Sequence, residues 1–123
     1  MADYQGIIGV VGNCVAGKTT LVNGLTALGY RAANSAQEHS MAPKLWMRKN
    51  PTVLVYLYCS LATAQKRRQI FWGQERLNDQ WQRLAHARAH CDLFLTTDEM
   101  TIQDVLETVI TFVSVKHKLT THE

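Results

Sequence analysis

Apolar residues along this chain occur either in unbroken runs or at helical spacing. Residues 6–11 form an unbroken apolar run, which is typical of a strand buried on both faces of a parallel sheet. Between Lys18 and Leu28 the apolar residues recur at helical spacing, and Gly29 follows where a left-handed C-cap is expected. The pattern therefore predicts a strand, a loop and a helix in the first 29 residues.

Three further strands are predicted. The clearest covers residues 53–58, which are rich in β-branched and aromatic side chains and follow Pro51. Shorter candidates cover residues 30–35 and 93–95. Strands that alternate with helices indicate an α/β fold with a small, mostly parallel sheet and helices on both faces, in three layers.

The remaining helices have recognisable starts and stops. A short helix is predicted at residues 41–49, and Ser60 is a predicted N-cap for a helix that breaks at Gly73 and resumes to about residue 90. Thr101 and Asp104 resemble a capping box that opens a last helix with a continuous apolar stripe. We therefore expect one domain over residues 1–115 and a frayed tail over residues 116–123.

Composition and charge narrow the classes of function. A chain of 123 residues fits one domain, and its net charge of +3 suits a phosphate-bearing ligand but falls short of a nucleic-acid-binding surface. No apolar run approaches the roughly 20 residues needed to cross a bilayer. Residues 1–5 lack the features of a secretory signal, so a cytoplasmic location without membrane partners is expected, and homo-oligomer formation is left open.

The number and spacing of the cysteines do not indicate a disulfide or a structural metal site. Cys14, Cys59 and Cys91 are odd in number and show no C-x-x-C spacing, which argues against both a disulfide framework and a zinc site. We interpret them as reduced thiols.

The strongest chemical signal is residues 12–19, GNCVAGKT, which match G-x-x-x-x-G-K-[ST] between a predicted strand and a predicted helix. The alternative, an ordinary glycine turn, does not require this spacing or this context. The motif predicts a phosphate-binding loop for ATP and Mg²⁺, with its binding residues being Gly12, Asn13, Cys14, Val15, Ala16, Gly17, Lys18, Thr19 and Thr20.

Each residue type in the loop has a physical role. Gly12 and Gly17 allow the backbone to wrap closely around an anion, and successive N–H groups converge on phosphate oxygens. Lys18 adds a mobile positive charge, and Thr19 offers a hydroxyl to Mg²⁺, which prefers oxygen ligands. Cys14 contributes mainly through its backbone, and we expect no redox role for its thiol.

With this loop, the strand at 53–58, the basic helix after Ser60 and residues 89–98, the chain resembles the small-molecule and nucleotide kinases of the P-loop NTPase superfamily. Adenylate kinase, shikimate kinase and dephospho-CoA kinase are the nearest relatives by this resemblance. It implies a three-layer P-loop NTPase fold and transfer of the γ-phosphoryl group of ATP to a small-molecule acceptor.

The resemblance also implies arginines around the transferred phosphoryl group, because this reaction needs cations at the equatorial oxygens. Arg76 and Arg83 are the candidates, with pairing to nearby carboxylates on a solvated helix as an equal alternative. For Arg67, Arg68 and Arg88 the solvated face is the preferred interpretation.

Glu38 is the best candidate for a catalytic carboxylate. It follows the predicted second strand, so it would emerge at the carboxyl end of the sheet, where ligands of open α/β folds bind. It could orient Mg²⁺ through water or accept a proton from an acceptor hydroxyl, while a helix cap or a salt bridge is the structural alternative. His39 beside it is more typical of a hydrogen-bonded loop residue than of a base.

One feature departs from the kinase pattern. Between the predicted second strand and Val53 no apolar strand ends in an acidic residue, which is where the superfamily normally places the carboxylate that organises the metal. A nucleotide-binding module with little or no phosphotransfer is therefore the main alternative. A GTP-dependent switch is less favoured, because the chain has no N-K-x-D motif for guanine.

Overall fold

Four parallel strands form one sheet in the computed structural model, which describes residues 4–121, with side chains up to His117. The strands are β1 (Ile7–Gly12), β2 (Arg31–Asn34), β3 (Val53–Tyr58) and β4 (Leu93–Thr96). Between and after them lie the helices α1 (Lys18–Ala27), α2 (Leu61–Arg67), α3 (Gln74–Arg83), α4 (Ala85–His90) and α5 (Ile102–Thr121), and the 3₁₀ turns η1 (Gln37–His39) and η2 (Leu45–Lys49).

The order of the strands in the sheet is β2-β1-β3-β4. All three pairings are parallel, so β1 and β3 occupy the centre. The chain leaves β1 toward β2 on one side and later returns to place β3 on the other, which makes the carboxyl end of β1 the topological switch point of the sheet. The predicted α/β fold is confirmed.

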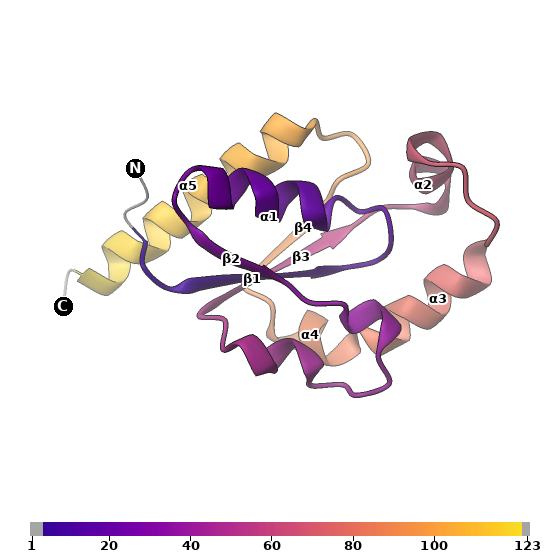
Figure 1. Ribbon diagram of the computed structural model, residues 1–123, viewed down its shortest axis with the longest axis horizontal. Helices are drawn as coiled ribbons and strands as arrows, with labels where there is room; N and C mark the ends of the chain where they lie inside the picture. The colour runs from indigo at the N-terminus through magenta and orange to yellow at the C-terminus, as the bar shows by residue number, and fades with distance from the viewer. Residues whose placement is uncertain (1–3, 122–123) are drawn as a thin grey trace.

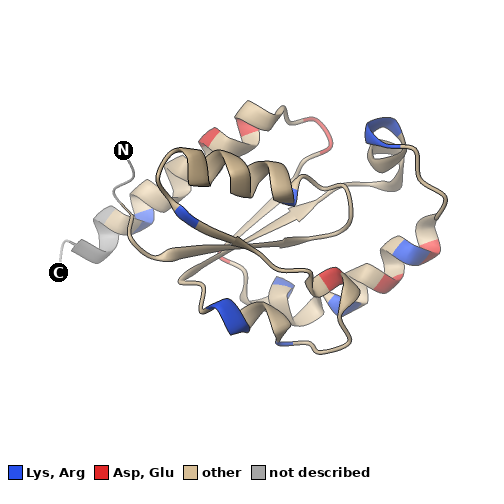
Figure 2. Cartoon of the chain, in the orientation of Figure 1, with Lys and Arg blue, Asp and Glu red and all other residues tan. Residues whose placement is uncertain are grey.

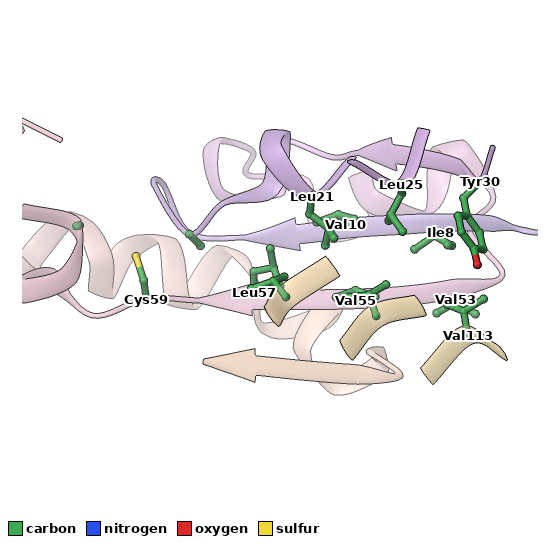
Figure 3. Packing of buried hydrophobic residues seen from close by; sticks show 14 residues of the cluster. Ile8, Val10, Leu21, Leu25, Tyr30, Val53, Val55, Leu57, Cys59 and Val113 are labelled. Atoms are coloured by element: carbon green, nitrogen blue, oxygen red, sulfur yellow. The ribbon is translucent and has the colours of Figure 1, made fainter. Parts of the chain in front are cut away.

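Alternate residues of the central strands enter two apolar clusters, one on each face of the sheet. Val53, Val55 and Leu57 pack with α1 and α5, whereas Leu54 and Tyr56 pack toward η2 and α4. Figure 1 shows α1 and α5 on one side of the sheet and α3, α4 and the 3₁₀ turns on the other. Figure 3 shows the first cluster, where side chains from β1, β3, α1 and α5 meet. The three layers follow from this two-sided burial.

Predicted signals at helix ends match the structure. Gly29 has φ 93°, the left-handed conformation that ends α1. The Ser60 side chain accepts from the backbone N–H of Thr63 at the start of α2. Thr101 and Asp104 form the reciprocal hydrogen bonds of a capping box, both at 3.0 Å, before α5.

Three boundaries differ from the sequence-based expectation. The helix predicted at residues 41–49 is only the 3₁₀ turn η2, and the second basic helix is interrupted at Leu84, between α3 and α4. α5 continues through residues 116–121, for which a frayed tail was expected, and residues 122–123 lie outside the described part. The apolar stripe that includes Val105, Val109 and Val113 holds α5 on the sheet. No helix within residues 4–121 is long and apolar enough to cross a membrane.

Candidate functional site

The loop between β1 and α1 has the backbone conformation that its glycines predict. A Cβ on Gly12 would lie 2.1 Å from the carbonyl oxygen of Leu57, so close pairing with β3 excludes a side chain there. Gly17, just before α1, has φ 106°. Val15 has φ 67°, an unusual conformation for a β-branched residue, and costly conformations of this kind cluster at ligand-binding sites.

Asn13 fastens the loop to the end of β3. Its buried side-chain amide donates to the carbonyl oxygen of Cys59 at 3.1 Å and accepts from the backbone N–H of Cys59 at 3.0 Å. Burial raises the pKa of the Cys59 thiol, against the opposing effect of the hydrogen bond from Asn13. Asn13 therefore holds the loop by a paired amide interaction, and the thiol of Cys59 is kept neutral.

Gln80 of α3, which lies on the face of the sheet opposite α1, hydrogen-bonds to the loop. Its Oε1 accepts from the backbone N–H of Cys14 at 2.9 Å, and its Nε2 donates to the Cys14 sulfur at 3.1 Å. Gln80 is 2% exposed. The sequence patterns alone did not predict this contact of Gln80. Its position three residues after buried Leu77 and four before buried Leu84 was the available signal.

Lys18 and Glu38 form a buried ion pair at the mouth of the loop. The Lys18 Nζ lies 2.8 Å from Oε2 of Glu38 and donates to the carbonyl oxygen of Asn13 at 3.1 Å. Both side chains are less than one-tenth exposed. The second carboxylate oxygen of Glu38, Oε1, is buried and has no hydrogen-bond partner among the described residues. An oxygen of this kind is a free acceptor that points to an interaction with something other than the chain.

Thr19 is paired with the strand that adjoins β1. The side-chain amide of Asn34, the last residue of β2, donates to Oγ1 of Thr19 at 3.3 Å. The register places Asn34 opposite Val10 of β1, two residues before Gly12 at the start of the loop. An amide, not a carboxylate, therefore stands beside the Thr19 hydroxyl.

A cavity of about 780 Å³ opens over the loop. Its lining combines loop residues, Glu38 and Asn34 with two arginines and the segment that leads into α5; the residues are Cys14, Val15, Ala16, Gly17, Lys18, Thr19, Thr20, Leu21, Asn34, Ala36, Glu38, Arg67, Arg68, Thr97, Met100, Thr101, Ile102 and Val105. Figure 2 shows the basic end of α2 and the loop that precedes α1. The cavity thus joins cations, backbone amides and one buried carboxylate.

Arg67 reaches back to the loop from α2. Its guanidinium donates to the carbonyl oxygen of Val15 and to Oγ1 of Thr97, each at 3.1 Å. Thr97 in turn donates to the carbonyl oxygen of Ala16 at 3.1 Å. These contacts join α2, the end of β4 and the loop. Arg67 and Arg68, for which a solvated helix face was the preferred interpretation, both line the cavity.

The other candidate arginines lie elsewhere. Arg76 is exposed on α3, and Arg83 pairs with Asp79 at 3.0 Å; neither lines the cavity. Arg88 lies over the ring of Trp81, 3.6 Å from its centroid, and donates to the Trp81 carbonyl oxygen at 2.8 Å. In this structure the cations nearest the loop are therefore Lys18, Arg67 and Arg68.

No model of a known protein family matches this chain, and no curated protein sequence matches it at the threshold of the comparison. Fold and site geometry carry the functional interpretation: an α/β fold with an all-parallel four-stranded sheet, and a cation-lined cavity at its switch point.

Proposed function

We propose that this protein binds a nucleoside triphosphate, ATP in the first instance, and transfers its γ-phosphoryl group to a small-molecule acceptor. The observation that carries the proposal is the juxtaposition of Lys18, the following helix N-terminus and buried Glu38 in one cavity. Backbone N–H groups and a lysine suit a polyphosphate, and a carboxylate with a free oxygen suits proton transfer. The resemblance to P-loop kinases supports the same assignment.

The oxygen groups that line the cavity fit a hard cation. The Thr19 hydroxyl is the group that would hold Mg²⁺ and its waters, since magnesium prefers oxygen ligands. When bound, the ion would neutralise charge on the phosphate oxygens. Lys18 and Arg67 would add positive charge, while Met100 and Ile102 offer apolar surface for a base.

Glu38 would act as the proton acceptor. As the acceptor hydroxyl oxygen bonds to the γ-phosphorus, the bond from that phosphorus to its bridging oxygen breaks and ADP departs. The hydroxyl proton passes to the carboxylate of Glu38. For this step the Lys18–Glu38 pair must open, because Lys18 then turns to the phosphates.

A nucleotide-binding module without efficient transfer is the second candidate. It is favoured by the two strands that flank β1, RAAN and VLVYLY, neither of which contains a carboxylate. Asn34 stands where a metal-organising carboxylate would be useful, and Lys18 engages Glu38. Binding then serves recognition of the nucleotide, and turnover is slow.

Lys18→Ala tests nucleotide binding. Removing a charge-assisted contact should weaken MgATP binding about 10- to 100-fold, measured by calorimetry. Lys44→Ala, at an exposed lysine before η2, is the matched control and should leave the affinity unchanged. Circular dichroism verifies that both variants are folded. Unchanged affinity in a folded Lys18→Ala protein would refute the proposed binding site.

Release of ADP separates the two candidates. With MgATP and panels of nucleosides, nucleotides and small hydroxy acids, a kinase should release ADP faster with one acceptor class than with none. Glu38→Gln should then lower turnover at least tenfold with a much smaller effect on ATP affinity. If no acceptor raises the rate while ATP still binds, the binding module is the better description. Equal losses of turnover and affinity would make Glu38 a positioning residue.

A further inference from the structure

Three side chains with different ligand atoms meet beside the phosphate loop. The Cys14 sulfur, a carboxylate oxygen of Glu38 and a ring nitrogen of His39 all lie within 4.8 Å of one another. Cys14 comes from the loop after β1, whereas Glu38 and His39 come from η1 after β2. We propose that Cys14, Glu38 and His39 form a zinc-binding site, with the fourth position left to water.

The spacing of the ligand atoms fits a tetrahedral ion. Bonds of about 2.3 Å to sulfur and about 2.0 Å to nitrogen place those two atoms about 3.5 Å apart around zinc, and a nitrogen and an oxygen about 3.4 Å apart. Here the Cys14 sulfur lies 3.5 Å from Nε2 of His39. Nε2 of His39 lies 3.6 Å from Oε2 of Glu38. The third pair, the Cys14 sulfur and a carboxylate oxygen of Glu38, lies within 4.8 Å.

Burial and orientation of the ligands support the site independently of the spacing. Glu38 is 5% exposed, and its Oε1, the oxygen that does not contact Lys18, has no partner among residues 4–117, so the buried carboxylate has unused acceptor capacity for a cation. The N–H of the Gln80 side chain donates to the Cys14 sulfur at 3.1 Å, which fixes the position of the sulfur. His39 is half exposed, so its ring can turn toward an ion.

The donor set selects the metal. Sulfur, imidazole nitrogen and one carboxylate oxygen suit zinc, whereas magnesium requires oxygen ligands in octahedral geometry. Three protein ligands and one open position are the usual composition of a zinc site that retains a water.

Lys18 competes with the ion. Its ammonium occupies Oε2 of Glu38 at 2.8 Å, and its positive charge repels a dication beside it. Zinc must therefore displace Lys18 from the carboxylate. Because zinc and Lys18 compete for the Glu38 carboxylate, removing the lysine should tighten zinc binding.

The zinc site does not rest on the proposed nucleotide binding, so it is tested without nucleotide. Wild-type protein is titrated with Zn²⁺ by calorimetry and with Co²⁺ by absorption, where a thiolate ligand produces a charge-transfer band. We expect the band in the wild type, its loss in Cys14→Ser, and zinc binding at least tenfold weaker in Glu38→Gln and His39→Asn. Lys18→Ala should bind zinc at least tenfold more tightly.

Control variants separate zinc binding at this site from binding by other side chains on the surface. His86 and His90 of α4 stack with ring centroids 4.3 Å apart and could hold an ion of their own. His90→Gln should remove any second binding event. Both His90→Gln and Cys91→Ser should preserve the cobalt–thiolate band. Because His39 is exposed, His39→Asn tests the site even if Glu38→Gln does not fold.

Several results would overturn the site. Absence of the cobalt–thiolate band in the wild type would do so, as would zinc affinity unaffected by Cys14→Ser or His39→Asn. An unchanged or weaker affinity in folded Lys18→Ala would remove Glu38 from the ligand set. If Lys18→Ala did not weaken MgATP binding, only the proposed nucleotide site would be contradicted.

Discussion

Gln80 illustrates how one side chain connects a distant element to the loop between β1 and α1. It contributes both a hydrogen-bond acceptor and a donor to Cys14, 66 residues earlier in the chain. Its amide fits between the loop and α3 without exposure to water. A hydrophobic side chain of similar size would leave the backbone N–H of Cys14 without this acceptor, so the polar residue is required at an otherwise apolar helix face.

Gln80→Ala should lower the free energy of unfolding by about 1–3 kcal/mol, because it leaves the part-buried backbone N–H of Cys14 without its acceptor. Urea denaturation measures this change. Gln82→Ala, at an exposed position of the same helix, is the matched control and should change stability by less than about 0.5 kcal/mol. Amide exchange at Cys14 should accelerate only in Gln80→Ala. Equal effects of the two substitutions would mean that the contact with Cys14 contributes nothing.

At the scale of elements, α2 depends on a carboxylate from outside the helix. Oδ1 of Asp98 accepts from the backbone N–H of Ser60 at 2.8 Å, which joins the end of β4 to the start of α2. Burial raises the pKa of Asp98. Hydrogen bonds from Ser60 and Thr63 and the charge of Arg67 together lower the pKa by more, so it lies below the ordinary 3.8. The ionised carboxylate therefore stabilises the folded protein.

This shift predicts how stability depends on pH. Because the pKa is lower in the folded state, the stabilisation is present above the ordinary pKa and is lost as the pH falls through the folded-state value. Asp98→Asn should cost about 0.5–1 kcal/mol at neutral pH, a modest effect because the group is largely solvated. The difference from wild type, measured by urea denaturation between pH 7 and 2, should shrink at the acidic end.

Glu99→Gln provides the control for that experiment, since Glu99 is exposed and adjacent. Its stability should follow the wild type across the pH range. If the difference in free energy of unfolding between wild type and Asp98→Asn grew on acidification, the ionised carboxylate of Asp98 would not stabilise the folded protein. The helix itself was predictable from Ser60, but this support by Asp98 was not, because it comes from 38 residues further along the chain.

At the scale of the molecule, the sheet order brings the site together. β2 and β3 pair directly with β1 on its two sides, so the residues that follow all three strands converge at one edge. Glu38 after β2, the loop after β1 and Cys59 after β3 meet there, and Thr97 after β4 completes the edge. Residues 35–52, between β2 and β3 in the chain, form no strand, and the side-chain amide of Asn34 at the end of β2 donates to the Thr19 hydroxyl.

The sequence by itself determined the strands, most helix ends and the loop backbone, because these depend on local spacing, glycine conformation and capping between near neighbours. Unbroken apolar runs marked the two central strands, and the capping box marked the start of α5. Glu38 was also predictable as a residue of the site, since it follows a strand that ends at the same edge as the loop.

Only the tertiary structure decided which distant side chains reach the loop. Lys18 and Glu38 are 20 residues apart, and Arg67 reaches Val15 across 52. Helical periodicity indicates which face a residue occupies, but not which loop packs against that face. Cys14, Glu38 and His39 likewise show no metal-binding spacing, because strand order rather than chain proximity brings them together.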